Sequence, residues 1–337
     1  MTSYNKSLEK VFPIVKSGGT DPSDATATAD DILSGKTAYV AGGKVTGTYM
    51  PDVLIEKTIT ANGEYLPASD NADGYSKVTV AVPIPTSKLP QVADRTVTEI
   101  TADDLSGATK IGAYALCECT ALRAVTLPSG VTRLENQSFY GCNHLESVTL
   151  PYGVKSIGSH AFEGCAGLTS ITIPDSVTNI GQSSFQFCAS LESATISKIV
   201  TSIESTLFNG CTALKSVIIP DSVTVVGTAA FQNCPSLTSV TIGNNVTSIG
   251  SSAFYNCRGL TSIDIPGSVT IIRTSSFDGC SGLTGIKINA TVPPTLYNNA
   301  FNNTNDCPIY VPATSVDAYK AATNWAALAS RIFAIQE

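Results

Sequence analysis

The 337-residue sequence is poor in charge and lacks long apolar runs. Charged residues make up 14% of the chain, the net charge is −7, and Lys and Arg form no cluster. A protein that neutralises phosphates needs such clusters, so the composition argues against a nucleic-acid partner. No stretch approaches ~18 uninterrupted apolar residues, so membrane insertion is not expected.

The N-terminus also lacks the pattern of a secretion signal. Its short apolar patch from Val11 to Val15 is interrupted by Pro13, and no basic segment or small-residue cleavage site accompanies it. Two alternatives stay open from the sequence: the chain is used without this export route, or a signal peptide has been removed.

Ten cysteines would suggest a disulfide framework, but their spacing does not fit one. Eight of them recur at one constant interval: Cys119, Cys142, Cys165, Cys188, Cys211, Cys234, Cys257 and Cys280. Disulfide scaffolds and zinc sites use clustered, uneven spacings, whereas a constant interval indicates an internal repeat. We predict that nearly all ten are free, buried thiols, because side chains that point in parallel from stacked coils are poorly placed for bridging.

Phenylalanine follows the same interval, always three residues before a cysteine: Phe139, Phe162, Phe185, Phe208, Phe231, Phe254 and Phe277. With Leu, Ile and Val columns the unit is L-x-x-I-x-I-P-x-x-V-x-x-I-G-x-x-A-F-x-x-C-x-x. L-x-x-I-x-I predicts a short strand that a proline ends, and A-F-x-x-C predicts a helical or 3-10 turn. One such coil cannot bury its apolar set alone, so the Phe and Cys columns are predicted to form a structural core between stacked coils.

This unit resembles the BspA-like (treponemal-type) leucine-rich repeat family, on segments such as SVTNIGQSSFQFCASLESATI. The resemblance implies a repeat solenoid, mainly β with short helical or 3-10 turns. It would be a right-handed leucine-rich-repeat array of about eight 23-residue units over residues 111–310. The asparagine ladder of common leucine-rich repeats is missing, and the inward cysteine column is expected to take a comparable place.

The segments on either side of the array have another composition. Residues 86–110, which begin with Pro-containing sequence, are predicted to be a linker and N-terminal cap. Residues 311–337 are predicted to form a C-terminal capping helix, which Thr314 and Asp317 would begin as a capping box.

Residues 1–85 are predicted to be a small β-rich N-terminal attachment region. Hairpin-type modules are expected at about 20–50, with a turn at residues 41–43, and at 52–82. These modules resemble small β-elements of tail-associated proteins of Gram-positive phages and prophages. The resemblance implies that this region binds an assembly partner; the alternative is that the modules are only spacers.

Little in the sequence supports catalysis. His144 lies near Cys142, but a nucleophilic pair needs an exposed thiol of low pKa, and Cys142 belongs to the inward column. Cys117 and Cys119 form a C-x-C pair, yet Cys119 begins the same column. We predict that the chain is not an enzyme and uses no metal or cofactor.

A partner is expected on the outward strand positions, which form a Ser/Thr ladder with a few charges. The candidate partner-binding residues are Arg123, Glu146, Glu192, Lys215, Thr172, Thr195, Asp264 and Lys287. Tyr140, Phe187 and Tyr255 lie near the coil edge: if exposed they indicate a binding edge, and if buried they belong to the core.

Together these features predict a non-catalytic recognition or adhesion protein that presents its repeat surface to a protein or glycan ligand. The expected setting is extracellular, at a bacterial cell surface, or on a phage virion as part of the tail. The alternative is a structural spacer with no specific ligand.

Overall fold

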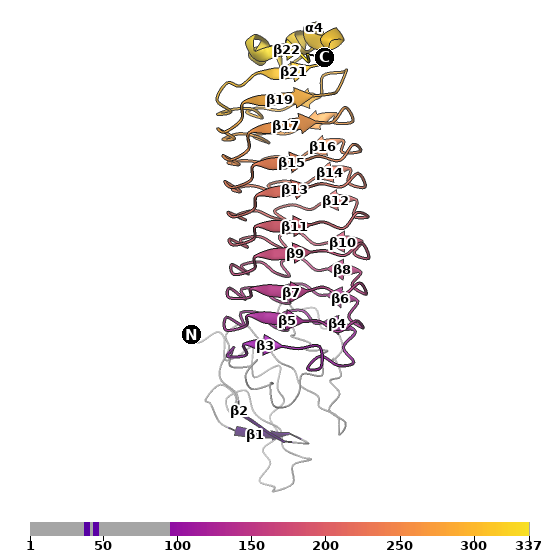
Figure 1. Ribbon diagram of the computed structural model, residues 1–337, viewed down its shortest axis with the longest axis vertical. Helices are drawn as coiled ribbons and strands as arrows, with labels where there is room; N and C mark the ends of the chain where they lie inside the picture. The colour runs from indigo at the N-terminus through magenta and orange to yellow at the C-terminus, as the bar shows by residue number, and fades with distance from the viewer. Residues whose placement is uncertain (1–36, 41–42, 47–94, 337) are drawn as a thin grey trace, which may run out of the picture.

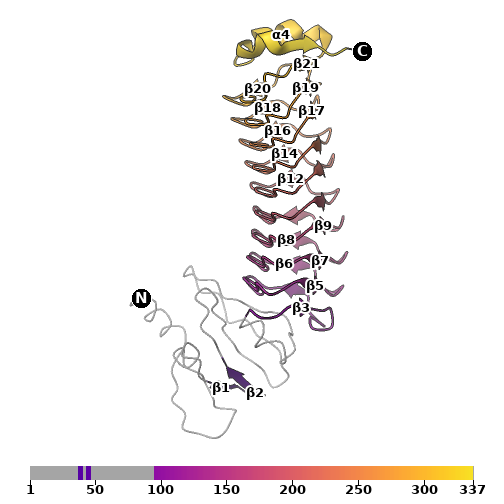
Figure 2. The same cartoon turned by 60° about the vertical axis from the view of Figure 1, so that its left-hand side comes forward.

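The computed structural model describes residues 37–40, 43–46 and 95–336, and residues 95–336 form a parallel β-solenoid (Figure 1). Each coil contributes one strand to a first side, which we call the strand face, and a shorter strand to a second side. The two series of strands run along the rod side by side, and the coils stack in sequence order up to the C-terminal helix α4 (Val316–Ala321) (Figure 2). The predicted solenoid class is confirmed.

The strand face is made of three parallel sheets of three, four and four strands. Its strands are β3 (Glu99–Ile100), β5 (Ala124–Thr126), β7 (Ser147–Thr149), β9 (Ser170–Thr172), β11 (Ser193–Thr195), β13 (Ser216–Ile218), β15 (Ser239–Thr241), β17 (Ser262–Ile265), β19 (Gly285–Ile288), β21 (Ile309–Val311) and β22 (Ile332–Ala334). The segment expected to be a linker and cap thus supplies the first of these strands, β3, which pairs with β5.

The second side is made of two parallel sheets of four and five strands. Its strands are β4 (Lys110–Ile111), β6 (Arg133–Leu134), β8 (Ser156–Ile157), β10 (Asn179–Ile180), β12 (Ser202–Ile203), β14 (Val225–Val226), β16 (Ser248–Ile249), β18 (Ile271–Ile272) and β20 (Thr295–Leu296). In each of these two-residue strands the second side chain is buried, which corresponds to the predicted V-x-x-I column.

The A-F-x-x-C segments are runs of turns with i→i+3 main-chain bonds, and they do not continue into regular helices. The residue two positions before each Phe is left-handed, with φ of 54–58° at Gln137, His160, Ser183, Thr206, Ala229, Ser252 and Ser275. Every second main-chain amide donates a hydrogen bond to the next coil, as Phe162 N does to Ser184 O. The amides between them donate within their own coil, as Glu163 N does to His160 O. Main-chain bonds between coils therefore alternate with i→i+3 bonds within each coil.

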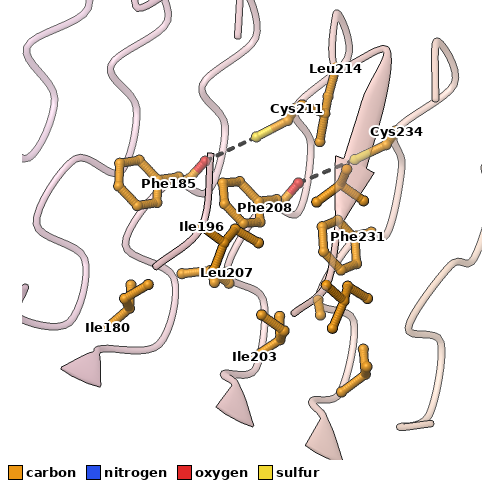
Figure 3. Packing of buried hydrophobic residues seen from close by; sticks show 14 of the residues in the cluster. Ile180, Phe185, Ile196, Ile203, Leu207, Phe208, Cys211, Leu214, Phe231 and Cys234 are labelled. Atoms are coloured by element: carbon orange, nitrogen blue, oxygen red, sulfur yellow. Dashed lines mark hydrogen bonds between the residues drawn. The ribbon is translucent and has the colours of Figure 1, made fainter. Parts of the chain in front are cut away.

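The phenylalanine column is the centre of the core (Figure 3). From Phe139 to Phe301 each ring is stacked on the next, with centroids 5.0–5.5 Å apart and planes within 4–12° of parallel. The rings from Phe139 to Phe277 are fully buried. Because this packing needs an equal ring in each neighbouring coil, the column holds the coils in register.

The cysteine column lies beside the rings and is also buried, as predicted. Its thiols donate to the main-chain oxygen of the Phe-column residue one coil earlier, at 2.9–3.2 Å, from Cys142 to Cys280. Ser176 and Ser268 add similar bonds to Val154 O and Val246 O. These bonds satisfy buried carbonyls that an asparagine ladder serves in other repeats.

The C-terminal segment covers the last coil with more than one helix. The 3-10 helix η1 (Ala313–Ser315) precedes α4, and η2 (Ala326–Arg331) leads into β22. Trp325 is buried against Phe301, with centroids 5.9 Å apart, and so ends the ring stack. The predicted capping box is wrong: no side chain caps α4, and the Ser315 hydroxyl donates to Thr291 O instead.

In the N-terminal region the structure describes one pair of strands. β1 (Thr37–Val40) and β2 (Gly43–Thr46) pair antiparallel, where the sequence predicts a hairpin. The turn residues 41–42, the predicted module at 52–82 and the remaining positions of 1–85 lie outside the described residues.

Replacing one ring of the stack tests its contribution. Phe208→Ala opens a cavity between Phe185 and Phe231, and we expect the free energy of unfolding to fall by about 3–5 kcal/mol in urea denaturation followed by circular dichroism. Tyr152→Ala, at an exposed position, is the control and is expected to change stability by less than about 0.5 kcal/mol. Similar losses in both variants would refute the role of the stack.

Candidate functional site

The strand face is the largest repeated surface that the described residues present. In β7, β9, β13 and β15 the middle side chain is buried and its two neighbours point to solvent, as in Ser147, Val148 and Thr149. In β21 the pattern is reversed, with Ile309 and Val311 buried and the middle residue, Tyr310, on the outer side. Parallel in-register pairing places equivalent residues of successive coils side by side, for example Thr172 and Thr195. Equivalent outward side chains of successive coils therefore form continuous columns.

The structure brings most of the predicted charged candidates together in pairs. Arg123 Nη1 lies 2.6 Å from Glu146 Oε1, and Lys215 Nζ lies 2.6 Å from Glu192 Oε2. Lys287 Nζ lies 3.2 Å from Asp264 Oδ2. Each pair joins adjacent coils across 23 residues. Exposed ion pairs of this kind contribute less than about 1 kcal/mol to the free energy of unfolding. Their main effect is therefore on the charge pattern of the surface.

The remaining candidates, Thr172 and Thr195, are exposed neighbours in the two coils that follow the Arg123–Glu146 pair, and Thr195 shares its coil with Glu192. In the next coil the same column holds Ile218, which is 68% exposed. No candidate is buried, and their arrangement as pairs and columns suits a contact surface.

The C-terminal end of the strand face holds aromatic residues that the sequence analysis missed. Tyr310 is in register with Lys287 on one side and with Phe333 on the other. The two rings have centroids 6.4 Å apart at an interplanar angle of 44°, and Phe333 is 50% exposed. We call Asp264, Lys287, Tyr310 and Phe333 the aromatic end. Their constant spacing, equal to the repeat length, is the signal that would have found it.

The three aromatic residues at the coil edge differ in exposure. Phe187 is 52% exposed, whereas Tyr140 and Tyr255 are half-buried. Of the two alternatives, a binding edge is therefore favoured at Phe187.

The two histidines make structural contacts. His144 Nδ1 lies 2.7 Å from Thr120 O, and His160 Nδ1 contacts the carboxylate of Glu163. Cys142 does not face His144, because its thiol donates to Leu116 O at 2.9 Å in the core. The described residues therefore assemble no histidine–thiol pair.

Burial disfavours thiolate formation along the cysteine column. It raises the pKa of Cys119 to about 12, with Cys117 adding to the shift and Arg95 opposing it. Burial also raises the pKa of Cys234 to about 12 and that of Cys165 well above its ordinary value. Nucleophilic and redox thiols need the opposite shift, so these positions are chemically inert.

Among the residues in described positions, no group of three or more His, Cys, Asp and Glu is placed to hold a metal ion. Across the same part of the chain, no helix has the length and apolar character needed to cross a membrane.

Comparison with known families gives one match. The model described as BspA type leucine rich repeat region, in six copies, matches residues 109–238 and 201–320. These stretches overlap and cover more than half of the chain. A comparison with curated proteins gives no match.

Solved structures of leucine-rich repeat proteins from bacteria are also similar. A protein from Bacteroides ovatus is 23% identical, with 96% of this chain and 100% of that chain covered and a TM-score of 0.36. A leucine rich cell surface protein from Faecalibacterium prausnitzii is 26% identical over 70% of this chain and 82% of its own, with a TM-score of 0.34. A protein from Eubacterium ventriosum is 22% identical over 69% and 74%, with a TM-score of 0.41.

The state of the thiols gives a chemical test. The ten cysteines form no disulfide, so urea-denatured protein should give ten equivalents with Ellman's reagent, while the native protein reacts slowly. Since folding raises thiol pKa values, the unfolded chain loses protons above about pH 8.5 that the folded chain keeps. Stability should be unaffected by the thiols below that pH and fall above it. A urea midpoint that rises with pH, or fast reaction of native protein, would contradict this.

Proposed function

Because the chain belongs to the BspA-type leucine-rich repeat family, we propose that it is a non-catalytic recognition protein whose strand face binds a protein or glycan partner. The aromatic end carries this proposal. It breaks the Ser/Thr ladder at outward positions, where stacking of the coils does not require an aromatic ring.

The residues of the aromatic end are of the types that form binding hot spots. Hot spots of interfaces favour aromatic side chains, which bury a large area with few rotatable bonds. Tyr310 and Phe333 offer two rings inclined to each other, and Lys287 with Asp264 supplies charged donors and acceptors beside them. A ligand seated here would cover apolar area and exchange hydrogen bonds with one charged pair.

The two ion pairs nearer the N-terminus support orientation and specificity. Arg123–Glu146 and Lys215–Glu192 present alternating charge on an otherwise neutral ladder. Exposed charges at an interface chiefly affect association rate and partner choice. We therefore propose that these two ion pairs contribute less to binding affinity than the aromatic end does.

For the setting, we propose a bacterial cell surface, with the alternative of a phage tail. In either setting residues 1–85 would attach the chain to an assembly and the array would project from it. The family match begins at residue 109 and supports only the array. The second candidate function is a spacer, favoured by the plain Ser/Thr ladder that separates the charged pairs from the aromatic end.

The test compares three proteins on arrays of glycans and host proteins, followed by surface plasmon resonance. Tyr310→Ser with Phe333→Ser removes both rings and is expected to weaken binding at least about tenfold, which is ~1.4 kcal/mol. The exchange Glu192→Lys with Lys215→Glu keeps an ion pair in reversed order. It should alter the association rate and salt dependence while leaving the thermal midpoint close to that of the unchanged protein.

Two results would contradict the proposal. One is unchanged binding by the aromatic variant. The other is repeated absence of any ligand, together with silent charge swaps at Arg123, Glu146, Glu192 and Lys215, which favours the spacer.

A further inference from the structure

Phe187 occupies a position that the repeat otherwise gives to small or polar residues. It directly precedes the column cysteine, where most coils hold glycine or asparagine: Gly141, Gly164, Gly210, Asn233, Asn256 and Gly279. The backbone there is left-handed, with φ of 59° at Phe187 and 70–78° at the glycines of this position. A bulky residue in this conformation is an outlier that costs about 1 kcal/mol or more.

The other large residue at this position has a structural partner. Glu118 is left-handed too, with φ of 53°, and forms an ion pair with Arg95. Phe187 lies on the turn side of the coil and is 52% exposed. Its Cδ1 atom lies 2.6 Å from where a Cβ on Gly210 would be, so the ring rests over the bare backbone of the next coil. The Cδ1–Cε1 edge of the ring therefore lies against Gly210, and about half of the residue stays exposed to solvent.

The turn that holds this ring and the next two turns toward the C-terminus carry no charge. The turn segments of three successive coils, 182–190, 205–213 and 228–236, contain no charged residue. The turns outside them do contain ionisable residues: His160 and Glu163 before, and Arg258 and Asp278 after. On the side of the ring toward Gly210, a charged ligand would therefore find no charged side chain in the next two turns.

These three turns carry side-chain amides instead. Gln186, Asn209 and Gln232 occupy the position after the column Phe in the same three coils, and Asn233 is exposed one residue further. The side-chain oxygen of Asn209 is buried and has no hydrogen-bond partner in the described part of the chain. Amides both donate and accept, which matches hydroxyl groups in either orientation.

We propose that Phe187 and side-chain amides of these turns form a second binding site, on the turn side of the array, for a neutral saccharide. The apolar face of a sugar ring would stack on Phe187, and its hydroxyls would bond the amides of Gln186 and Gln232. A protein partner is less suited to this place, because a stable protein interface buries several anchors and this turn region offers one ring.

The site is tested by saturation-transfer NMR and titration calorimetry of the full chain with neutral oligosaccharides: cellobiose, maltotriose, chitotriose and N-acetyllactosamine, with sialyllactose as the charged comparison. At least one neutral sugar should bind with saturation transferred from aromatic protons, and sialyllactose should bind no better than its neutral core. Phe187→Asn should weaken binding at least about tenfold, and Phe187→Tyr should retain it.

The design separates binding from folding and from the strand face. Phe187→Asn introduces the residue found at positions 233 and 256, which tolerates left-handed backbone, so its thermal midpoint should not fall. Tyr152→Asn removes another exposed aromatic residue and should leave sugar binding within about twofold, as should the Tyr310→Ser, Phe333→Ser variant.

The proposal is overturned if no neutral sugar binds at millimolar concentration, or if Phe187→Asn binds as the unchanged protein does. It is also overturned if sugar binding is lost in the strand-face variant and kept in Phe187→Asn. That last result would leave the proposed function of the strand face standing.

Discussion

Neighbouring coils of this protein contact each other through one repeated inward set, in which the phenylalanine ring is the largest member. The constant repeat length places each ring over the one before it, at 5.0–5.5 Å between centroids. The thiol beside it donates to a main-chain oxygen one coil earlier. No coil could bury these groups alone, so every coil depends on its neighbours, and the ends need Trp325 and β3 to close the stack.

This dependence divides the residues into two kinds. Inward positions must be nearly identical from coil to coil, and they carry no information about a partner. Outward positions are free to differ, and the differences are concentrated in three ion pairs, in the aromatic end and at Phe187. The recognition roles proposed above rest on these departures from the repeat. The cost of holding Phe187 in left-handed backbone is one that stacked coils can offset and an isolated turn cannot.

The sequence predicts the buried columns well, because a fixed interval identifies Phe208 or Cys211 as inward without knowledge of the local backbone. It does not predict the left-handed turns, since His160 and Thr206 give no glycine signal and the conformation is stabilised by main-chain bonds between coils. The Arg123–Glu146 pair follows from register alone, as does the pairing of Tyr310 with Phe333. Neither contact is evident at a single position, and each follows only from the equivalent positions of adjacent coils.

Hydrogen–deuterium exchange at single-residue resolution tests most directly whether the ring column holds the array together. From Phe139 to Phe277, the main-chain N–H of each column phenylalanine donates a hydrogen bond to a carbonyl oxygen of the next coil. Examples are Phe162 N to Ser184 O and Phe208 N to Ala230 O, both at 2.8 Å. If the ring column holds the array together, the main-chain amides of the column phenylalanines from Phe162 to Phe254 should be among the slowest to exchange. Their protection factors should also be similar to one another. Fast exchange at these amides, with protection confined to the strand face, would contradict this account.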